Sequence, residues 1–145
     1  MQNLTEIRDA YYDASTSKQS AEKFYNELSK YNKNNAVVLA YKGAAFALKS
    51  KYTFNKKDKK DFFVSGVKLI ENAVKEEPQN IEIRLVRLSI QENTPKFLKY
   101  KSNLEEDKKL ILLGYEKQPK EIKECVKKYV THSNVFTEVD KLKIK

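Results

Sequence analysis

The side chains that most often act as nucleophiles and general bases are scarce in this chain. It holds one histidine, His132, and one cysteine, Cys125. On one helix this spacing separates the two side chains by roughly 10 Å along the axis, too far for a nucleophile–base pair. Cys125 falls on the apolar stripe of that helix, which favours core packing over reactivity. His132 stands near the expected end of the helix, which favours a role as a partner of the helix dipole over base catalysis.

The acidic residues and the glycines show no catalytic pattern either. Glu105, Glu106 and Asp107 stand together at the expected start of a helix, where negative charge complements the helix dipole. The three glycines are too scattered for a phosphate-binding loop. A single cysteine excludes an internal disulfide and a cysteine-based zinc cluster. We therefore predict that the protein is not an enzyme and has no metal site and no cofactor.

One arginine cluster stands out in a chain that otherwise uses lysine. Of the 29 basic residues only three are arginines, and Arg84, Arg87 and Gln91 lie at i, i+3 and i+7 on one helix face. Arginine offers a rigid bidentate fork that lysine lacks. The favoured interpretation is a partly buried ion pair or carbonyl clamp that holds adjacent hairpins. The alternative is a site for an anion or a peptide carboxylate, with Tyr41 or Tyr100 as neighbours.

A lysine-rich segment over residues 51–61, "KYTFNKKDKKD", is the second candidate site. We expect it to be a charged connection between two helices, inserted within a hairpin. The favoured interpretation is a solvated loop whose aromatic residues, Tyr52 and Phe54, fold back onto the core. The alternative is a contact with nucleic acid or another polyanion. The lysines that would make it are Lys56, Lys57, Lys59 and Lys60.

The overall charge has a simpler explanation than ligand binding. The formal net charge is +9, and lysine-covered helix faces favour solubility. The preference for lysine over arginine, together with frequent asparagine, is typical of an A/T-rich genome. No window holds the roughly 18 consecutive apolar residues of a membrane span, so we expect no membrane insertion.

Helical spacing of apolar residues and helix caps predict the elements that position these side chains. The expected helices run from the Asn3–Glu6 capping pair to about Tyr12, from the Thr16–Gln19 pair to Tyr31, over 36–50, over 62–76, from Ile81 to about Gln91, from Ser102 or Asn103 to about Tyr115, and onward from Gln118–Pro119. The tail, 134–145, fits either a docked extended chain or a frayed helix. The sequence thus predicts an all-α protein of about seven helices in a single domain, 1–145.

The helix expected over 36–50 is apolar nearly all round, which is typical of a buried helix. Its small residues, Gly43, Ala44 and Ala47, indicate that the backbone of a neighbouring helix comes close.

The pattern over residues 17–91 resembles tetratricopeptide repeats, which are antiparallel helix hairpins with a period of about 34 residues. The positions that carry the resemblance are Ala21, Tyr25 and Leu28, then Gly43 and Phe46, and finally Gly66, Ile70, Ala73 and Pro78. Gly43 and Gly66 are 23 positions apart, where an ideal repeat would have about 12. The resemblance implies hairpins stacked in a right-handed superhelix, with an insertion at 51–61.

The stretches "YKGAA" and "EIRLVRLSIQENTPKFLKY" are similar to an uncharacterised bacterial family of small helical, often exported proteins. This likeness implies a fold and an export route but no activity. The first residues do not read as a signal peptide. We expect export to the periplasm or cell envelope if Met1 replaces a removed signal peptide before Gln2, and a cytoplasmic protein otherwise; the sequence does not separate the two.

Stacked hairpins form grooves, and nothing in the sequence forms a reaction centre. The predicted function is therefore a non-catalytic module that binds a protein or peptide partner. The alternative is a basic binder of nucleic acid or another polyanion through the lysine-rich segment.

Overall fold

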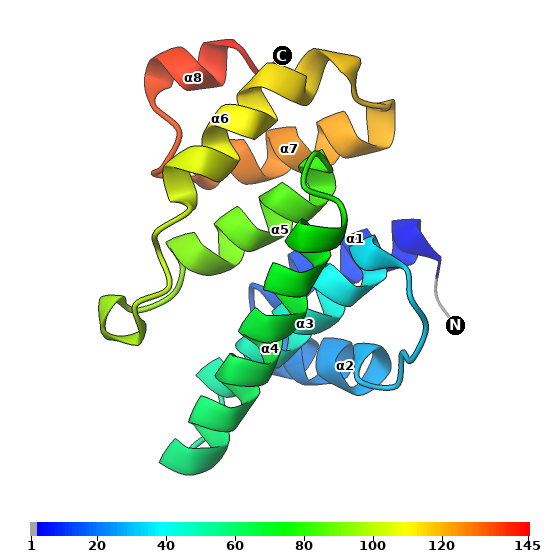
Figure 1. Ribbon diagram of the computed structural model, residues 1–145, viewed down its shortest axis with the longest axis vertical. Helices are drawn as coiled ribbons and strands as arrows, with labels where there is room; N and C mark the ends of the chain where they lie inside the picture. The colour runs from blue at the N-terminus through cyan, green and yellow to red at the C-terminus, as the bar shows by residue number, and fades with distance from the viewer. Residues whose placement is uncertain (1–2) are drawn as a thin grey trace. The chain divides into compact units, whose positions relative to one another are not determined.

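The computed structural model describes residues 3–145, and over this range it contains helices and no strands (Figure 1). This confirms the predicted all-α class. The chain divides into two compact units, Met1–Glu77 and Pro78–Lys145. The single domain over 1–145 and the tetratricopeptide-like superhelix stay predictions. Met1 and Gln2, on which the choice between export and the cytoplasm rests, lie outside the described residues.

The first unit holds four helices: α1 (Leu4–Ala14), α2 (Lys18–Leu28), α3 (Ala36–Lys51) and α4 (Lys56–Glu76). Each begins after a side chain that accepts a hydrogen bond from a backbone N–H in the first turn. The predicted cap at Asn3 is confirmed, because the N–H of Glu6 donates to Asn3 Oδ1 at 2.9 Å. The predicted cap at Thr16 is wrong: Ser17 caps α2, while the Thr16 hydroxyl donates to the Asp13 carbonyl.

The lysine-rich segment is mostly helix and not a connection. Asn55 caps α4, with the N–H of Asp58 donating to its Oδ1 at 3.1 Å, so the helix begins at Lys56. Only residues 52–55 join α3 to α4. The prediction of a connection over 51–61 is therefore wrong for Lys51, which ends α3, and for residues 56–61. These residues lack an apolar stripe, but lysine is a good helix former and the cap supplies the start signal.

The small residues of α3 and α4 allow the two backbones to touch. Gly43 is buried, as predicted, and Ala44 and Ala45 are fully buried beside it. A Cβ added at Gly43 would lie 2.6 Å from the carbonyl oxygen of Gly66, and one added at Gly66 would lie 2.5 Å from the carbonyl oxygen of Gly43. Glycine is therefore required on both helices at this crossing.

The second unit holds α5 (Ile81–Glu92), a 3₁₀ turn η1 (Lys96–Leu98), α6 (Leu104–Gly114), a 3₁₀ turn η2 (Tyr115–Lys117), α7 (Lys120–His132) and α8 (Glu138–Leu142). Its core contains Ile81, Leu85, Leu88, Ile111, Tyr115, Ile122, Val126, Val130, Phe136 and Ile144. Asn80 caps α5 as predicted, with Ile83 N–H donating at 3.0 Å. None of the helices described in the two units is long and apolar enough to cross a membrane, as expected.

The C-terminal tail is neither extended nor frayed, so both predicted alternatives are wrong. It forms α8, which brings the α-helices of residues 3–145 to eight, where about seven were expected. Thr137 and Asp140 form a reciprocal capping box at its start. Phe136 and Ile144 on either side of α8 are buried in the core of the second unit. These two apolar anchors and the capping box explain why so short a helix is ordered.

The contact between Gly43 and Gly66 gives a direct test of the packing in the first unit. Alanine has the better helix propensity, by about 1 kcal/mol, but its Cβ would meet backbone that must move. We expect Gly43→Ala or Gly66→Ala to lower the free energy of unfolding by about 1–3 kcal/mol. Urea unfolding measures this, with Ser65→Ala at the exposed neighbouring position of α4 as the control. A glycine variant as stable as the control variant would contradict the close crossing.

Candidate functional site

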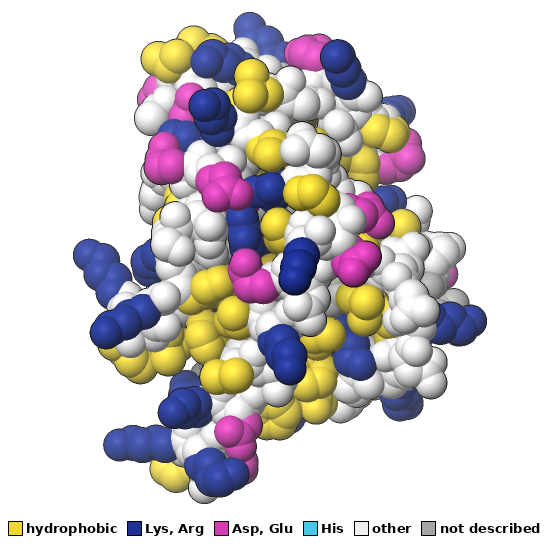
Figure 2. Space-filling model, in the orientation of Figure 1, with side chains coloured by type: hydrophobic (Ala, Val, Ile, Leu, Met, Phe, Trp, Pro, Cys, Tyr) yellow, Lys and Arg dark blue, Asp and Glu magenta, His cyan; other side chains and the backbone are white. Residues whose placement is uncertain are grey.

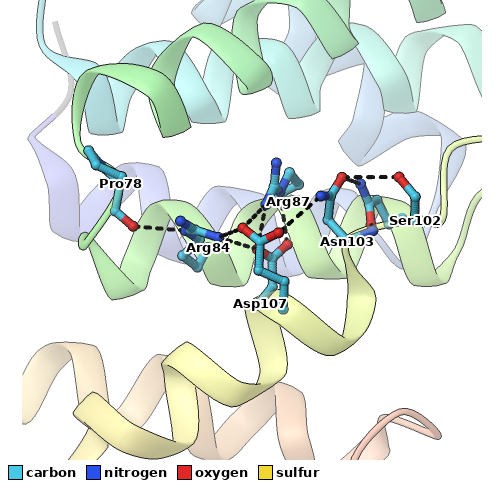
Figure 3. Close-up of polar contacts among 8 residues, drawn as sticks. Pro78, Arg84, Arg87, Ser102, Asn103 and Asp107 are labelled. Atoms are coloured by element: carbon cyan, nitrogen blue, oxygen red, sulfur yellow. Dashed lines mark hydrogen bonds and ion pairs between the residues drawn. The ribbon is translucent and has the colours of Figure 1, made fainter.

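Arg84 and Arg87 lie one turn apart on α5, and both are almost completely buried, at 5% and 3% exposure. Figure 3 shows their guanidinium groups pointing toward Asp107, which lies in the first turn of α6. Asp107 itself has no exposed surface. The three charges are therefore removed from solvent together, and their partners must come from the protein.

Arg87 binds Asp107 through two parallel hydrogen bonds. Its Nε donates to Oδ2 at 2.9 Å, and its Nη2 donates to Oδ1 at 2.7 Å. Arg84 adds a third bond from Nη1 to Oδ1 at 3.0 Å. This geometry uses the planar fork that lysine cannot provide.

A second carboxylate, Glu106, balances the charge at the edge of the network. Its Oε2 accepts from Nη1 of Arg84 at 2.5 Å and from Nη2 of Arg87 at 3.4 Å. The hydrogen bond from Arg84 has the largest effect on the pKa of Glu106 and lowers it, against a smaller opposing effect of desolvation. The Glu106 side chain is 54% exposed, so two buried cations face one buried and one solvated anion.

The network also contains a hydrogen bond to a backbone carbonyl. Arg84 Nε donates to the backbone carbonyl of Pro78 at 3.0 Å. The contacts thus confirm the ion pair, which joins α5 to α6 within the second unit. The carbonyl bond joins Arg84 only to the residues before its own helix, so the prediction that such a clamp holds adjacent hairpins is wrong. A ligand-binding role for Arg84 and Arg87 stays a prediction, although protein carboxylates already occupy both guanidinium groups.

Gln91 continues the same face of α5 and is fully buried. It exchanges two hydrogen bonds with Asn103: Nε2 donates to Oδ1 at 3.2 Å, and Oε1 accepts from the backbone N–H at 3.1 Å. Asn103 stands at the start of α6 as predicted, but its side chain bonds Gln91 instead of capping the helix. Gln91 therefore fixes where α6 begins.

Sequence analysis missed Asp107 as the partner of the arginines and explained it by the helix dipole alone. The spacing of the interacting residues is the same on the two helices and could have indicated the pairing. Arg87 and Gln91 are four positions apart on α5, and Asn103 and Asp107 are four apart at the start of α6. Such pairs meet when two helices run antiparallel.

The two tyrosines proposed as neighbours of the arginines lie in different units. Tyr41 is buried in the first unit, where its ring meets that of Tyr11 edge-on at 5.5 Å. Tyr100 is buried in the second unit, between η1 and α6. Their proposed roles beside a ligand stay predictions.

The four candidate lysines for polyanion binding lie on the first two turns of α4. Lys56, Lys57 and Lys60 are exposed, and Lys59 Nζ donates to the Lys51 carbonyl at 3.4 Å. Phe54, in the preceding turn, is 100% exposed. The prediction that this aromatic residue folds back onto the core is therefore wrong.

The residues considered for catalysis are placed as the helical pattern predicts. Cys125 is partly buried against the core of the second unit, and His132 is the last residue of α7. Within residues 3–145 no group of three or more His, Cys, Asp or Glu side chains is arranged to hold a metal ion.

Glu92, at the end of α5, is a second polar centre that sequence analysis missed. Its carboxylate accepts from the Tyr129 hydroxyl at 2.5 Å, the Ser133 hydroxyl at 2.7 Å and the Asn134 N–H at 2.8 Å. Partial burial has the largest single effect on the pKa of Glu92 and raises it, but the hydrogen bonds together outweigh it and lower the pKa. Glu92 thereby ties the end of α7 to α5.

An open groove lies between α7 and α8 and has a volume of about 540 Å³. Val130 and Ile144, which also belong to the core, form its apolar part. The remaining lining residues are polar or charged: Lys127, Thr131, Glu138, Lys141 and Lys145.

Comparison with known proteins adds no relative: no family model matches the chain, and no curated protein or solved structure matches it. The geometry of the chain's own residues is therefore the basis for any functional proposal.

The lowered pKa of Glu92 predicts a specific pH dependence. Its folded pKa lies below the ordinary value of 4.5, so the carboxylate stabilises the protein above about pH 4.5 and this contribution is lost as the pH falls through the folded pKa. Glu92→Gln places an amide N–H against the donor at Asn134. We expect it to cost about 1–2 kcal/mol near pH 7 and much less near pH 3.

Urea unfolding at the two pH values measures this difference. Glu124→Gln, at an exposed position on α7, is the matched control and should change stability little at either pH. A Glu92→Gln cost that is equal at both pH values would contradict the role of the ionised carboxylate.

Proposed function

We propose that this protein is a non-catalytic module that binds an acidic segment of a protein or peptide partner. The observation that carries the proposal is the groove between α7 and α8. The groove is open along the surface, which suits a length of chain better than an enclosed small molecule.

The lining supports an acidic partner. Lys127, Lys141 and Lys145 supply three positive charges, against one negative charge from Glu138. Val130 and Ile144 also line the groove but are almost completely buried, so charge dominates the surface that a partner would meet. An acidic segment would complement this charge.

The direct test is fluorescence anisotropy with two labelled peptides, one alternating glutamate with leucine and one alternating lysine with leucine. We expect the acidic peptide to bind and the basic one not to. The Lys127→Glu/Lys141→Glu variant should weaken acidic-peptide binding by about tenfold or more, because it reverses two rim charges. Lys117→Glu/Lys120→Glu makes the same change at exposed positions outside the groove.

Equal affinity for both peptides, or equal weakening by the two variants, would contradict a specific groove. None of the four lysines is buried, so we expect both variants to fold. Circular dichroism of each variant checks this.

A second candidate function is binding of a polyanion at the start of α4, through Lys56, Lys57, Lys59 and Lys60. The exposure of Lys56, Lys57 and Lys60 favours it. These lysines lie beside the exposed ring of Phe54, so a ligand with both negative charge and an apolar part would fit better than a purely charged one.

A further inference from the structure

The hairpin tip, defined as residues 51–61, contains the end of α3, the turn 52–55 and the first turns of α4. At the bottom of Figure 1 the start of α4 extends past α2. In the same orientation, Figure 2 shows Lys and Arg side chains at this end, with acidic side chains and a little apolar surface among them. The tip therefore presents charge and apolar surface together.

Phe54 differs from the other phenylalanines of the same hairpin. It is 100% exposed, whereas Phe63 is buried and Phe46 and Phe62 pack edge-on against each other with ring centroids 6.2 Å apart. An exposed phenylalanine loses the hydrophobic stabilisation that its neighbours gain. Burial of the Phe54 ring against a binding partner would therefore be favourable.

The turn that carries Phe54 is held on both sides. Before it, the Thr53 hydroxyl donates to the Lys49 carbonyl at 2.7 Å, and the Thr53 N–H donates to the Ser50 carbonyl at 3.1 Å. After it, Asn55 caps α4. An ordered turn thus presents the ring to solvent, which reduces the entropy cost of binding through it.

The charge around Phe54 is positive. The tip carries five lysines and two aspartates. One aspartate, Asp61, is engaged by Lys57 at 3.1 Å in an exposed pair. Lys56 and Lys60 are exposed. A partner for the tip must therefore combine negative charge with an apolar interior.

We propose that the hairpin tip binds the surface of a membrane rich in anionic lipids. Phe54 enters the boundary between headgroups and acyl chains, and Lys56 and Lys60 contact headgroup phosphates. Basic residues beside an exposed apolar side chain give reversible binding of this kind. The inference rests on the polyanion alternative above and is independent of the groove, which belongs to the other unit.

A lipid surface suits the tip better than a single-stranded nucleic acid does. Base stacking covers one face of an aromatic ring and usually continues along a groove with further aromatic platforms. The neighbouring ring, Tyr52, is already covered by Lys51 Nζ at 5.4 Å from its centroid. A lipid interface instead surrounds a side chain from all sides.

The second unit has a similar combination of residues at η1, where Phe97 is 76% exposed between Lys96 and Lys99.

The chain contains no tryptophan, so a single introduced one reports on its own surroundings. We expect the fluorescence of the Phe54→Trp variant to shift to the blue with vesicles of phosphatidylcholine and phosphatidylglycerol in equal parts, and not with phosphatidylcholine alone. Val64→Trp, at a 53% exposed position further along α4, is the control and should not shift. An unshifted Phe54→Trp emission, or an equal shift at position 64, would overturn the proposal.

Vesicle co-sedimentation of the full chain tests the contribution of the Phe54 ring and that of the lysines separately. Phe54→Ser should lower partitioning onto the anionic vesicles by about tenfold, and Lys56→Gln/Lys60→Gln by about tenfold. Val64→Ser and Lys68→Gln/Lys75→Gln are the matched controls at exposed positions of α4. Equal partitioning of the parent and the Phe54→Ser variant onto anionic vesicles would overturn the proposal.

Single-stranded DNA distinguishes failure of the lipid inference from failure of the polyanion function. DNA binding that Phe54→Ser abolishes, without vesicle binding, would make the tip a nucleic-acid site. Absence of both would remove the polyanion function as well.

Discussion

The second unit depends on the neutralisation of one buried carboxylate, Asp107. A carboxylate without solvent is very costly unless hydrogen-bonded cations replace the water. Arg87 supplies two such bonds and Arg84 a third. Because the fork has one productive geometry, it also fixes which turn of α6 faces α5. The Gln91–Asn103 pair fixes the same alignment one turn further along. A shift of α6 by one residue would separate these pairs.

The two kinds of basic residue thus contribute differently. Arg84 and Arg87 are buried and bound to carboxylates of the same unit. Lysines dominate the exposed charge, as at the hairpin tip and along the groove between α7 and α8. A flexible, solvated ammonium suits reversible contact with an acidic surface, whereas the guanidinium fork suits a fixed internal pair. Both functional proposals therefore rest on lysines: those along the groove, and those beside the exposed Phe54 at the tip.

The sequence predicted those features that depend on local pattern. Helix periodicity and asparagine caps placed most helices, and the small residue at Gly43 predicted close backbone contact. Contacts between distant positions were beyond that reasoning, since nothing local links Asp107 to Arg87. The start of α4 was missed because Lys56–Asp61 has no apolar stripe, and a capped helix that projects into solvent needs none. The exposure of Phe54 was missed for the opposite reason, because hydrophobicity alone favours burial.

The most direct test of the structural role of the arginines is the free energy of unfolding of Arg87→Lys, measured in urea with and without citrate. This variant keeps the charge and loses the fork. The account predicts a loss of about 1–3 kcal/mol relative to the parent, unchanged by citrate, because the protein itself supplies the anion. A variant as stable as the parent, together with a citrate-dependent rise in the unfolding midpoint of the parent, would contradict the account and make the arginine face of α5 an anion-binding site.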